Sequence, residues 1–102
     1  MSQADTVVFR KWKENGDVIA LFPELPADIL GILCDAYVSI GQHGGADYHG
    51  VIRQTTPCSS EQSADLAVEL QRIGYRLRPL KRASRVHHDN RRQLASDLRR
   101  TV

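Results

Sequence analysis

The strongest constraint on the fold is a predicted β-hairpin near the start of the chain. Residues 7–13, Val-Val-Phe-Arg-Lys-Trp-Lys, are rich in β-branched and aromatic side chains, and residues 18–22, Val-Ile-Ala-Leu-Phe, form a continuous apolar run. Between them, Asn15-Gly16 tolerates the positive φ that both central positions of a type I′ turn require. We therefore predict two antiparallel strands, the second of them inside the sheet because its apolar run has no polar face.

Proline and glycine set the expected limits of the next elements. Pro23 and Pro26 are expected to end the second strand, because proline cannot donate a ladder hydrogen bond. Residues 27–34 fit a short helix or helical turn that Gly31 would weaken, and their assignment stays open. The pattern then predicts a third strand over residues 36–40, a glycine-rich loop over residues 41–47 and a fourth strand over residues 48–55.

The clearest helix signal follows Thr56-Pro57. Ser59 and Gln62 have the spacing of a capping box, in which each residue satisfies a backbone N–H group of the other. Leu66 and Leu70 then lie four residues apart, so one stripe of the helix is apolar. Gly74 stands where a left-handed residue ends a helix. We predict a helix from Ser59 to about residue 73.

These elements predict an α+β fold. Residues 76–82 suggest a fifth strand, which Pro79 would confine to a sheet edge. The expected architecture is one domain over residues 1–82, an antiparallel sheet of four to five strands in the order β-β-β-β-α-β with one helix on a face. Residues 83–102 are expected to form a basic C-terminal tail that is mobile or marginally helical from about Asn90. A homodimer through the uncovered sheet face is a further prediction.

Charge is divided unevenly along the chain. Residues 1–75 carry five basic and ten acidic side chains, whereas residues 76–102 carry nine basic and two acidic ones. Eight of those nine are arginines, whose planar guanidinium groups suit bidentate contacts to phosphate or carboxylate. The segment is therefore expected either to fold back onto the acidic part of the chain or to bind an external polyanion.

This asymmetry gives the first functional hypothesis, a non-enzymatic interaction module. Its partner would be a polyanion, either a nucleic acid bound through its phosphates or an acidic protein. The candidate polyanion-binding residues are Arg78, Lys81, Arg82, Arg85, Arg91, Arg92, Arg99 and Arg100.

The second hypothesis places a small-ligand or metal-dependent site in the segment from Gly41 to His49. Imidazole and carboxylate groups can hold Zn²⁺ or Fe²⁺, and glycine lets backbone amides approach a ligand closely. The spacing His-x3-Asp-x-His matches no established metal motif, so we assign no metal and no cofactor; the alternative is a tight connection in which Asp47 caps loop amides. The candidate ligand-binding residues are Gln42, His43, Asp47, Tyr48 and His49.

Other signals are weaker. Arg10, Trp12 and Lys13 could form a surface that binds single-stranded nucleic acid, although Trp12 is better explained as a core or dimer anchor. His87-His88-Asp89 is a second histidine cluster, in which adjacent side chains point apart. No nucleophile elbow, phosphate loop or zinc-protease motif is present, so an enzyme is not the favoured expectation.

The sequence also bears on compartment. No apolar run approaches the roughly 18 residues that span a bilayer, and residues 1–5 lack the order of a signal peptide. Cys34 and Cys58 form no CxxC pair and are expected to be reduced thiols. We therefore expect a cytoplasmic protein that does not contact a membrane. A third functional hypothesis is an accessory inhibitor protein from a mobile element, which would bind a larger complex.

Several strings within residues 7–82 resemble a family of short bacterial proteins. They include residues 9–13, Phe-Arg-Lys-Trp-Lys, residues 18–24, Val-Ile-Ala-Leu-Phe-Pro-Glu, and residues 41–48, Gly-Gln-His-Gly-Gly-Ala-Asp-Tyr. That family has no assigned activity, so the resemblance implies no role for any residue.

Overall fold

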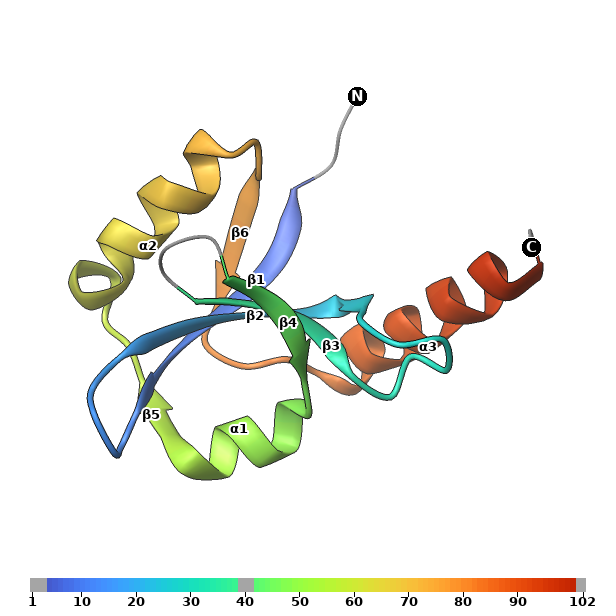
Figure 1. Cartoon of the computed structure of the whole chain (residues 1–102), viewed down its shortest axis with the longest axis horizontal. Coiled ribbons are helices and arrows are strands. Elements are labelled where there is room, and N and C mark those ends of the chain that lie inside the picture. Colours follow the sequence, from blue (N-terminus) through green and yellow to red (C-terminus); the bar gives the residue numbers. More distant parts are fainter. Residues whose placement is uncertain (1–3, 39–41, 101–102) are drawn as a thin grey trace.

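The structure is a computed structural model that describes residues 4–38 and 42–100. Nine elements follow one another within these described ranges (Figure 1). They are β1 (Asp5–Trp12), β2 (Val18–Pro26), β3 (Cys34–Val38), β4 (Gln42–Ala46), α1 (Tyr48–Gln54), β5 (Thr55–Pro57), α2 (Ser60–Arg72), β6 (Leu77–Leu80) and α3 (Arg85–Arg100).

The fold is α+β, with a six-stranded sheet that is antiparallel except at one pair. The strand order is β4-β3-β2-β1-β5, and β6 pairs in parallel with the first half of β1. The predicted hairpin of β1 and β2 is confirmed, with Val8 opposite Leu21. Its connection covers residues 13–17, longer than the predicted two-residue turn, and Gly16 there has φ of 77°. A loop of that length with a left-handed glycine is another common hairpin closure.

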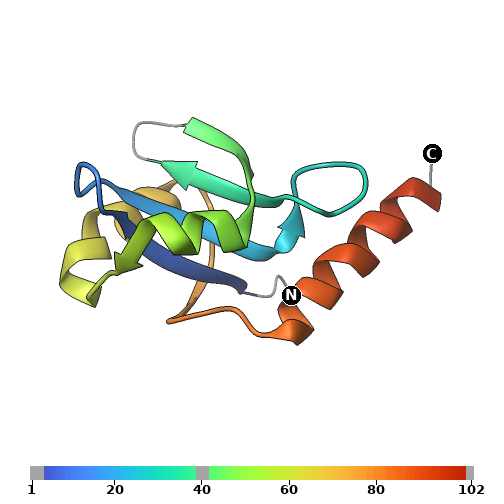
Figure 2. The ribbon, with the colours of Figure 1, turned by 90° about the horizontal axis from the view of Figure 1, so that it is seen from below.

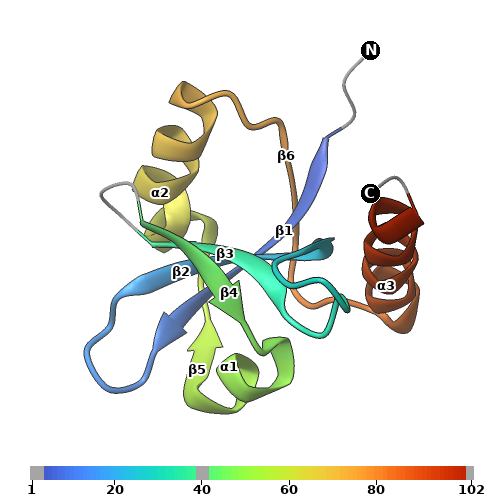
Figure 3. The same cartoon turned by 45° about the vertical axis from the view of Figure 1, so that its right-hand side comes forward.

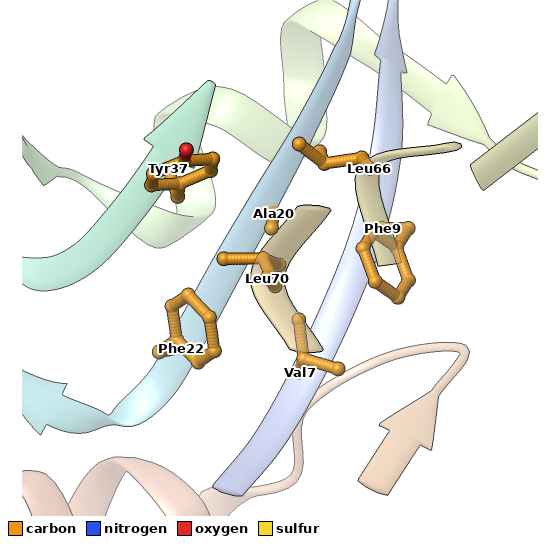
Figure 4. Close-up of a cluster of buried hydrophobic side chains, with 7 residues drawn as sticks. All are labelled: Val7, Phe9, Ala20, Phe22, Tyr37, Leu66 and Leu70. Carbon is orange, nitrogen blue, oxygen red and sulfur yellow. The ribbon is translucent and has the colours of Figure 1, made fainter. Parts of the chain in front are cut away.

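Helix α2 covers one face of the sheet and builds the main core (Figure 4). Its predicted capping box is present, since the Ser59 hydroxyl accepts from the Gln62 amide at 3.1 Å and the Gln62 side chain accepts from the Ser59 amide at 3.0 Å. Gly74 has φ of 111° and ends the helix as expected. The buried cluster comprises Val7, Phe9, Ala20, Phe22, Tyr37, Leu66 and Leu70.

The opposite face is covered by α1, which corrects two predictions. Residues 48–54 are helical rather than a fourth strand, because Tyr48 and Val51 bury one side of a short helix against Val8, Ile19 and Leu21. Figure 3 shows α1 and α2 on opposite sides of the sheet. Among the described residues, α1 covers part of the face on which the homodimer prediction was based, and Ile19, Ala36 and Val38 still line a pocket there. The homodimer itself stays a prediction.

The fourth strand lies earlier than predicted, at Gln42–Ala46, in the segment assigned to a loop. It pairs with the whole of β3, from Cys34 opposite Ala46 to Val38 opposite Gln42. Its glycines provide no apolar pattern, so the strand depends on backbone pairing with β3, to which the His43 ring adds a contact with Tyr37. The prediction for residues 36–40 is confirmed as far as Val38, and residues 39 and 40 lie outside the described residues.

Strand β2 also continues past its predicted end at Phe22. It runs through Pro23 and Pro26, and its pairing with β3 shifts register between Phe22 and Pro26. The prolines are tolerated there because an irregular stretch does not need every ladder donor. Pro79 confirms the edge position expected for the last strand, since β6 lies beside β1 at one side of the sheet.

The C-terminal tail forms a helix longer than the predicted marginal one. Helix α3 begins at Arg85 rather than near Asn90 and packs against β2. Its C-terminal half extends away from the sheet, beside the loop of residues 27–33 that joins β2 to β3 (Figure 2). A short amphipathic helix gains most of its stability from packing, which here comes from the second half of β2 and this loop.

Candidate functional site

Arg91 anchors α3 to the rest of the fold and is not available to an external partner. Its side chain is 3% exposed, although the sequence hypothesis placed it on a polyanion-binding surface. Its Nη1 donates to the Pro23 carbonyl at 2.7 Å, and its Nε donates to the Gly31 carbonyl at 2.8 Å. These carbonyls belong to the irregular end of β2 and the following loop, which sequence patterns do not place against the helix. The assignment of Arg91 as a surface residue is therefore wrong.

His88 lies beside Arg91 in the same contact. Its Nδ1 accepts from Arg91 Nη1 at 2.8 Å, so its proton is on Nε2, which is buried without a hydrogen-bond partner among the described residues. The ring packs edge-on against Tyr48, with centroids 4.9 Å apart. Burial, reinforced by the positive charge of Arg91, lowers the pKa of His88 to about 4. The imidazole is therefore neutral at pH 7.

The exposed arginines of α3 lie along one side of the helix. Arg85, Arg92 and Arg99 are seven residues apart, which is close to two helical turns, so they project from neighbouring angles. All three are exposed, as is Arg100. Arg92 is 3.6 Å from Asp89 in an exposed ion pair, an interaction worth at most about 1 kcal/mol. We call Arg85, Arg92 and Arg99 the arginine flank.

The other predicted basic residues precede α3. Lys81 and Arg82 are exposed in the connection from β6. Arg78 is also exposed, but its Nη2 donates to the Thr6 hydroxyl at 2.9 Å and lies 3.8 Å from Glu24. The segment thus combines both expected roles. Arg78, Arg91 and Arg99 donate hydrogen bonds to the body of the protein, whereas Arg85 and Arg92 are exposed along α3.

An apolar groove adjoins the C-terminal half of α3. Its volume is about 590 Å³ and it lies between the helix and residues 26–29. Leu98 is 53% exposed and Ile29 72% exposed, although large apolar side chains are usually covered. The Arg99 guanidinium donates to the Ile29 carbonyl across the groove. The lining residues are Pro26, Ala27, Asp28, Ile29, Ala95, Leu98 and Arg99. Sequence analysis missed this groove because it depends on how loop 27–33 meets α3.

The residues predicted for a ligand site between Gly41 and His49 do not converge. His43 lies against Tyr37 on the α2 side, with ring centroids 4.7 Å apart, whereas Tyr48 is buried on the α1 side. The Tyr48 hydroxyl accepts from the Ala83 amide at 2.7 Å, which ties α1 to the start of the C-terminal segment. His49 is exposed beside His88, with ring centroids 5.0 Å apart.

The two polar ends of the same segment lie apart from these rings. Asp47 is the N-cap residue of α1, and its side chain makes no capping hydrogen bond to that helix. Gln42 is exposed at the start of β4, and Gly41 lies outside the described residues. In the described parts of the chain, no group of three or more His, Cys, Asp or Glu side chains could hold a metal ion.

Two further sequence candidates have structural roles. Arg10 is buried, and its Nε donates to the Thr55 hydroxyl at 2.9 Å, so it cannot bind nucleic acid beside Trp12. Trp12 packs against the α1-side core, as the anchor interpretation expected. Cys34 and Cys58 are both free, and burial raises the pKa of Cys34 to about 11, which keeps the thiol protonated and unreactive.

Comparisons with other proteins assign no family to this arrangement. No protein-family model matches the chain, and searches of curated proteins and of solved structures found no significant match. None of the described helices is both long enough and apolar enough to cross a membrane. The hypothesis of an accessory inhibitor from a mobile element stays a prediction.

Proposed function

We propose that this protein is a non-enzymatic interaction module that binds a negatively charged macromolecule through α3. The observation that carries the proposal is the arginine flank, where Arg85, Arg92 and Arg99 stand exposed at seven-residue spacing. Lys81 and Arg82 extend the positive charge toward β6. Arginine suits this role because its rigid fork of donors matches the oxygens of phosphate and carboxylate groups.

The way α3 is held supports the same proposal. Arg91 fixes the helix to the body with two hydrogen bonds to backbone carbonyls, so the flank is displayed on an ordered element. A preorganised set of charges loses less conformational entropy on binding than a mobile tail would. Truncation after Arg82 is therefore an unsuitable test, because it would also expose the carbonyls that Arg91 covers.

The proposal is tested by paired charge removal. The variant Arg85→Gln/Arg92→Gln removes two charges from the flank, and Arg53→Gln/Arg72→Gln removes two exposed charges from α1 and α2. Polyglutamate and a short DNA duplex serve as labelled probes in fluorescence anisotropy across a salt series. We expect at least one probe to bind, with affinity that falls as salt rises.

For that probe, the flank variant is expected to bind roughly tenfold more weakly, the effect of about 1.4 kcal/mol. The α1 and α2 variant should bind like the parent protein. Failure of both probes to bind the parent, or equal weakening by both double variants, would refute the proposal.

A further inference from the structure

The groove beside α3 narrows the class of partner. We infer that the partner is a protein which inserts an acidic amphipathic helix between α3 and residues 26–29, an inference that rests on the proposed function. Apolar side chains on one face of that helix would fill the groove, and its carboxylates would meet the arginine flank. This is the helix-in-groove mode of peptide recognition, in which anchors repeat at i, i+3 or i+4, and i+7.

The groove offers apolar contact that only a partner with apolar side chains can use. Ala95 forms its floor, while Leu98 and Ile29 stand at its margins with more than half of each side chain exposed. Leu30 and Ile32 lie in the same loop as Ile29 and are 56% and 60% exposed. Removal of apolar surface from water is favourable, so two or three inserted side chains would contribute substantially to affinity.

A nucleic acid makes poor use of the same surface. Its phosphates gain from the arginines but nothing from aliphatic side chains, and its bases stack on aromatic rings. The residues that line the groove include no aromatic side chain. Contiguous exposed apolar residues next to charged ones are typical of surfaces that bind proteins.

Charge selects an acidic partner over a second copy of this chain. Arg99 lines the groove, and Arg92 lies two turns earlier on the same flank. The one acidic lining residue, Asp28, uses its carboxylate to accept from the Leu33 amide at 3.0 Å. Two copies that met through this surface would bring arginine flanks together, and like charges in an interface are unfavourable.

The test begins with selection from a displayed library of random helical peptides against the full chain. We expect enrichment of sequences in which Leu, Ile or Phe recur at helical spacing among Asp and Glu. Each recovered peptide is then synthesised and titrated against Leu98→Ser, which alters the groove without a change of charge. The matched control is Leu94→Ser, a residue of α3 that does not line the groove. Circular dichroism checks that both variants remain folded.

The expected result is at least tenfold weaker peptide binding to Leu98→Ser and nearly unchanged binding to Leu94→Ser. Recovered peptides that lack acidic residues, or that bind both variants alike, would overturn the inference. A DNA duplex that binds the parent and Leu98→Ser equally, with no peptide enriched, would also overturn it while the proposed function stands. Size-exclusion chromatography showing a dimer that Leu98→Ser dissociates would overturn it in favour of a second copy.

Discussion

Helices α2 and α3 both pack on the same sheet, but they use opposite kinds of side chain. Helix α2 buries Leu66 and Leu70 in the main core and leaves most of its charged residues exposed, while Glu69 accepts a hydrogen bond from Tyr37. Helix α3 buries Arg91 and His88, while Leu94 and Leu98 are 37% and 53% exposed. The leucines of α2 thus belong to the core, whereas those of α3 lie at the surface.

This contrast gives two mechanisms of attachment. Helix α2 is held by apolar burial, which is strong and tolerant of small changes in angle. Helix α3 is held by directional hydrogen bonds, two from the Arg91 guanidinium and others from Asn90 and Arg99, which fix its position but depend on a few atoms. If the two mechanisms differ, a substitution in the α2 core should destabilise the whole fold, whereas a substitution at the α3 contact should release α3 alone.

The largest expected loss of stability comes from a substitution in the buried face of α2. Leu70 is fully buried in the core cluster, so Leu70→Ala should lower the free energy of unfolding by about 3–4 kcal/mol through lost burial and the cavity left behind. Urea denaturation measures this change. Val68→Ala, on the exposed side of the same helix, should cost less than about 1 kcal/mol. Similar losses for the two variants would contradict the assignment of α2 to the core.

Arg91→Ala should have the next largest effect, about 3 kcal/mol. It removes hydrogen bonds from a charged donor and leaves the Pro23 and Gly31 carbonyls without that donor. Hydrogen exchange should show lost protection across α3 while the amides of β1 and β2 stay protected, because α3 can detach separately. Arg92→Ala, an exposed neighbour, is the control and should change stability by less than about 0.5 kcal/mol.

Acid should weaken the α3 contact through His88. The folded pKa of about 4 lies below the unfolded value of 6.5, so the unfolded chain binds the proton first. The stability that the neutral His88 gives the folded state is fully present above pH 6.5 and falls as the pH drops toward 4. The total loss of unfolding free energy is about 3 kcal/mol. Urea denaturation at intervals between pH 7 and pH 4 measures it. His88→Asn keeps an acceptor for Arg91 but does not titrate, so its stability should vary less across that range; an unchanged pH dependence would contradict the prediction.

The smallest expected loss of stability comes from a substitution where loop 27–33 lies close to α3. Gly31 has φ of 73°, and a Cβ atom there would lie 2.9 Å from the Ala95 Cβ. Gly31→Ala should therefore cost about 2 kcal/mol, from backbone strain together with displacement of the helix. Gly16→Ala is the matched control, because Gly16 has φ of 77° with no atom near the added Cβ, and it should cost only about 1 kcal/mol. Equal losses would mean that strain alone matters and that α3 does not press on the loop.

The part of the fold that sequence predicted is the part built from local signals. The hairpin around Asn15-Gly16 and the capped helix after Ser59 each depend on residues within a few positions of one another, and both are confirmed. Tyr48–Gln54 was misassigned because its side chains also fit an alternating strand. Asp47 at the N-cap position and apolar residues at 48, 51 and 52 were the helical signal that was available.

The candidate site was less accessible to sequence analysis. The exposed arginines could be anticipated from charge alone, since eight arginines fall within residues 76–102. Nothing in the local sequence shows that Arg91 is buried and Arg92 exposed. Arg91 is buried because it binds carbonyls more than 50 residues away in the sequence. The groove likewise forms between segments distant along the chain, which a periodicity within one helix does not report.

The long-range contacts of Arg91 also set an order for events during synthesis. The Gly31 and Pro23 carbonyls leave the ribosome 60 and 68 residues before the guanidinium that will cover them. Because chains are synthesised from the N-terminus onward, the sheet and α2 can assemble while the Pro23 and Gly31 carbonyls are still exposed to solvent. A nascent chain at that stage has its structural core but lacks the docking surface that we propose, so binding of a partner through α3 would become possible only after α3 has left the ribosome.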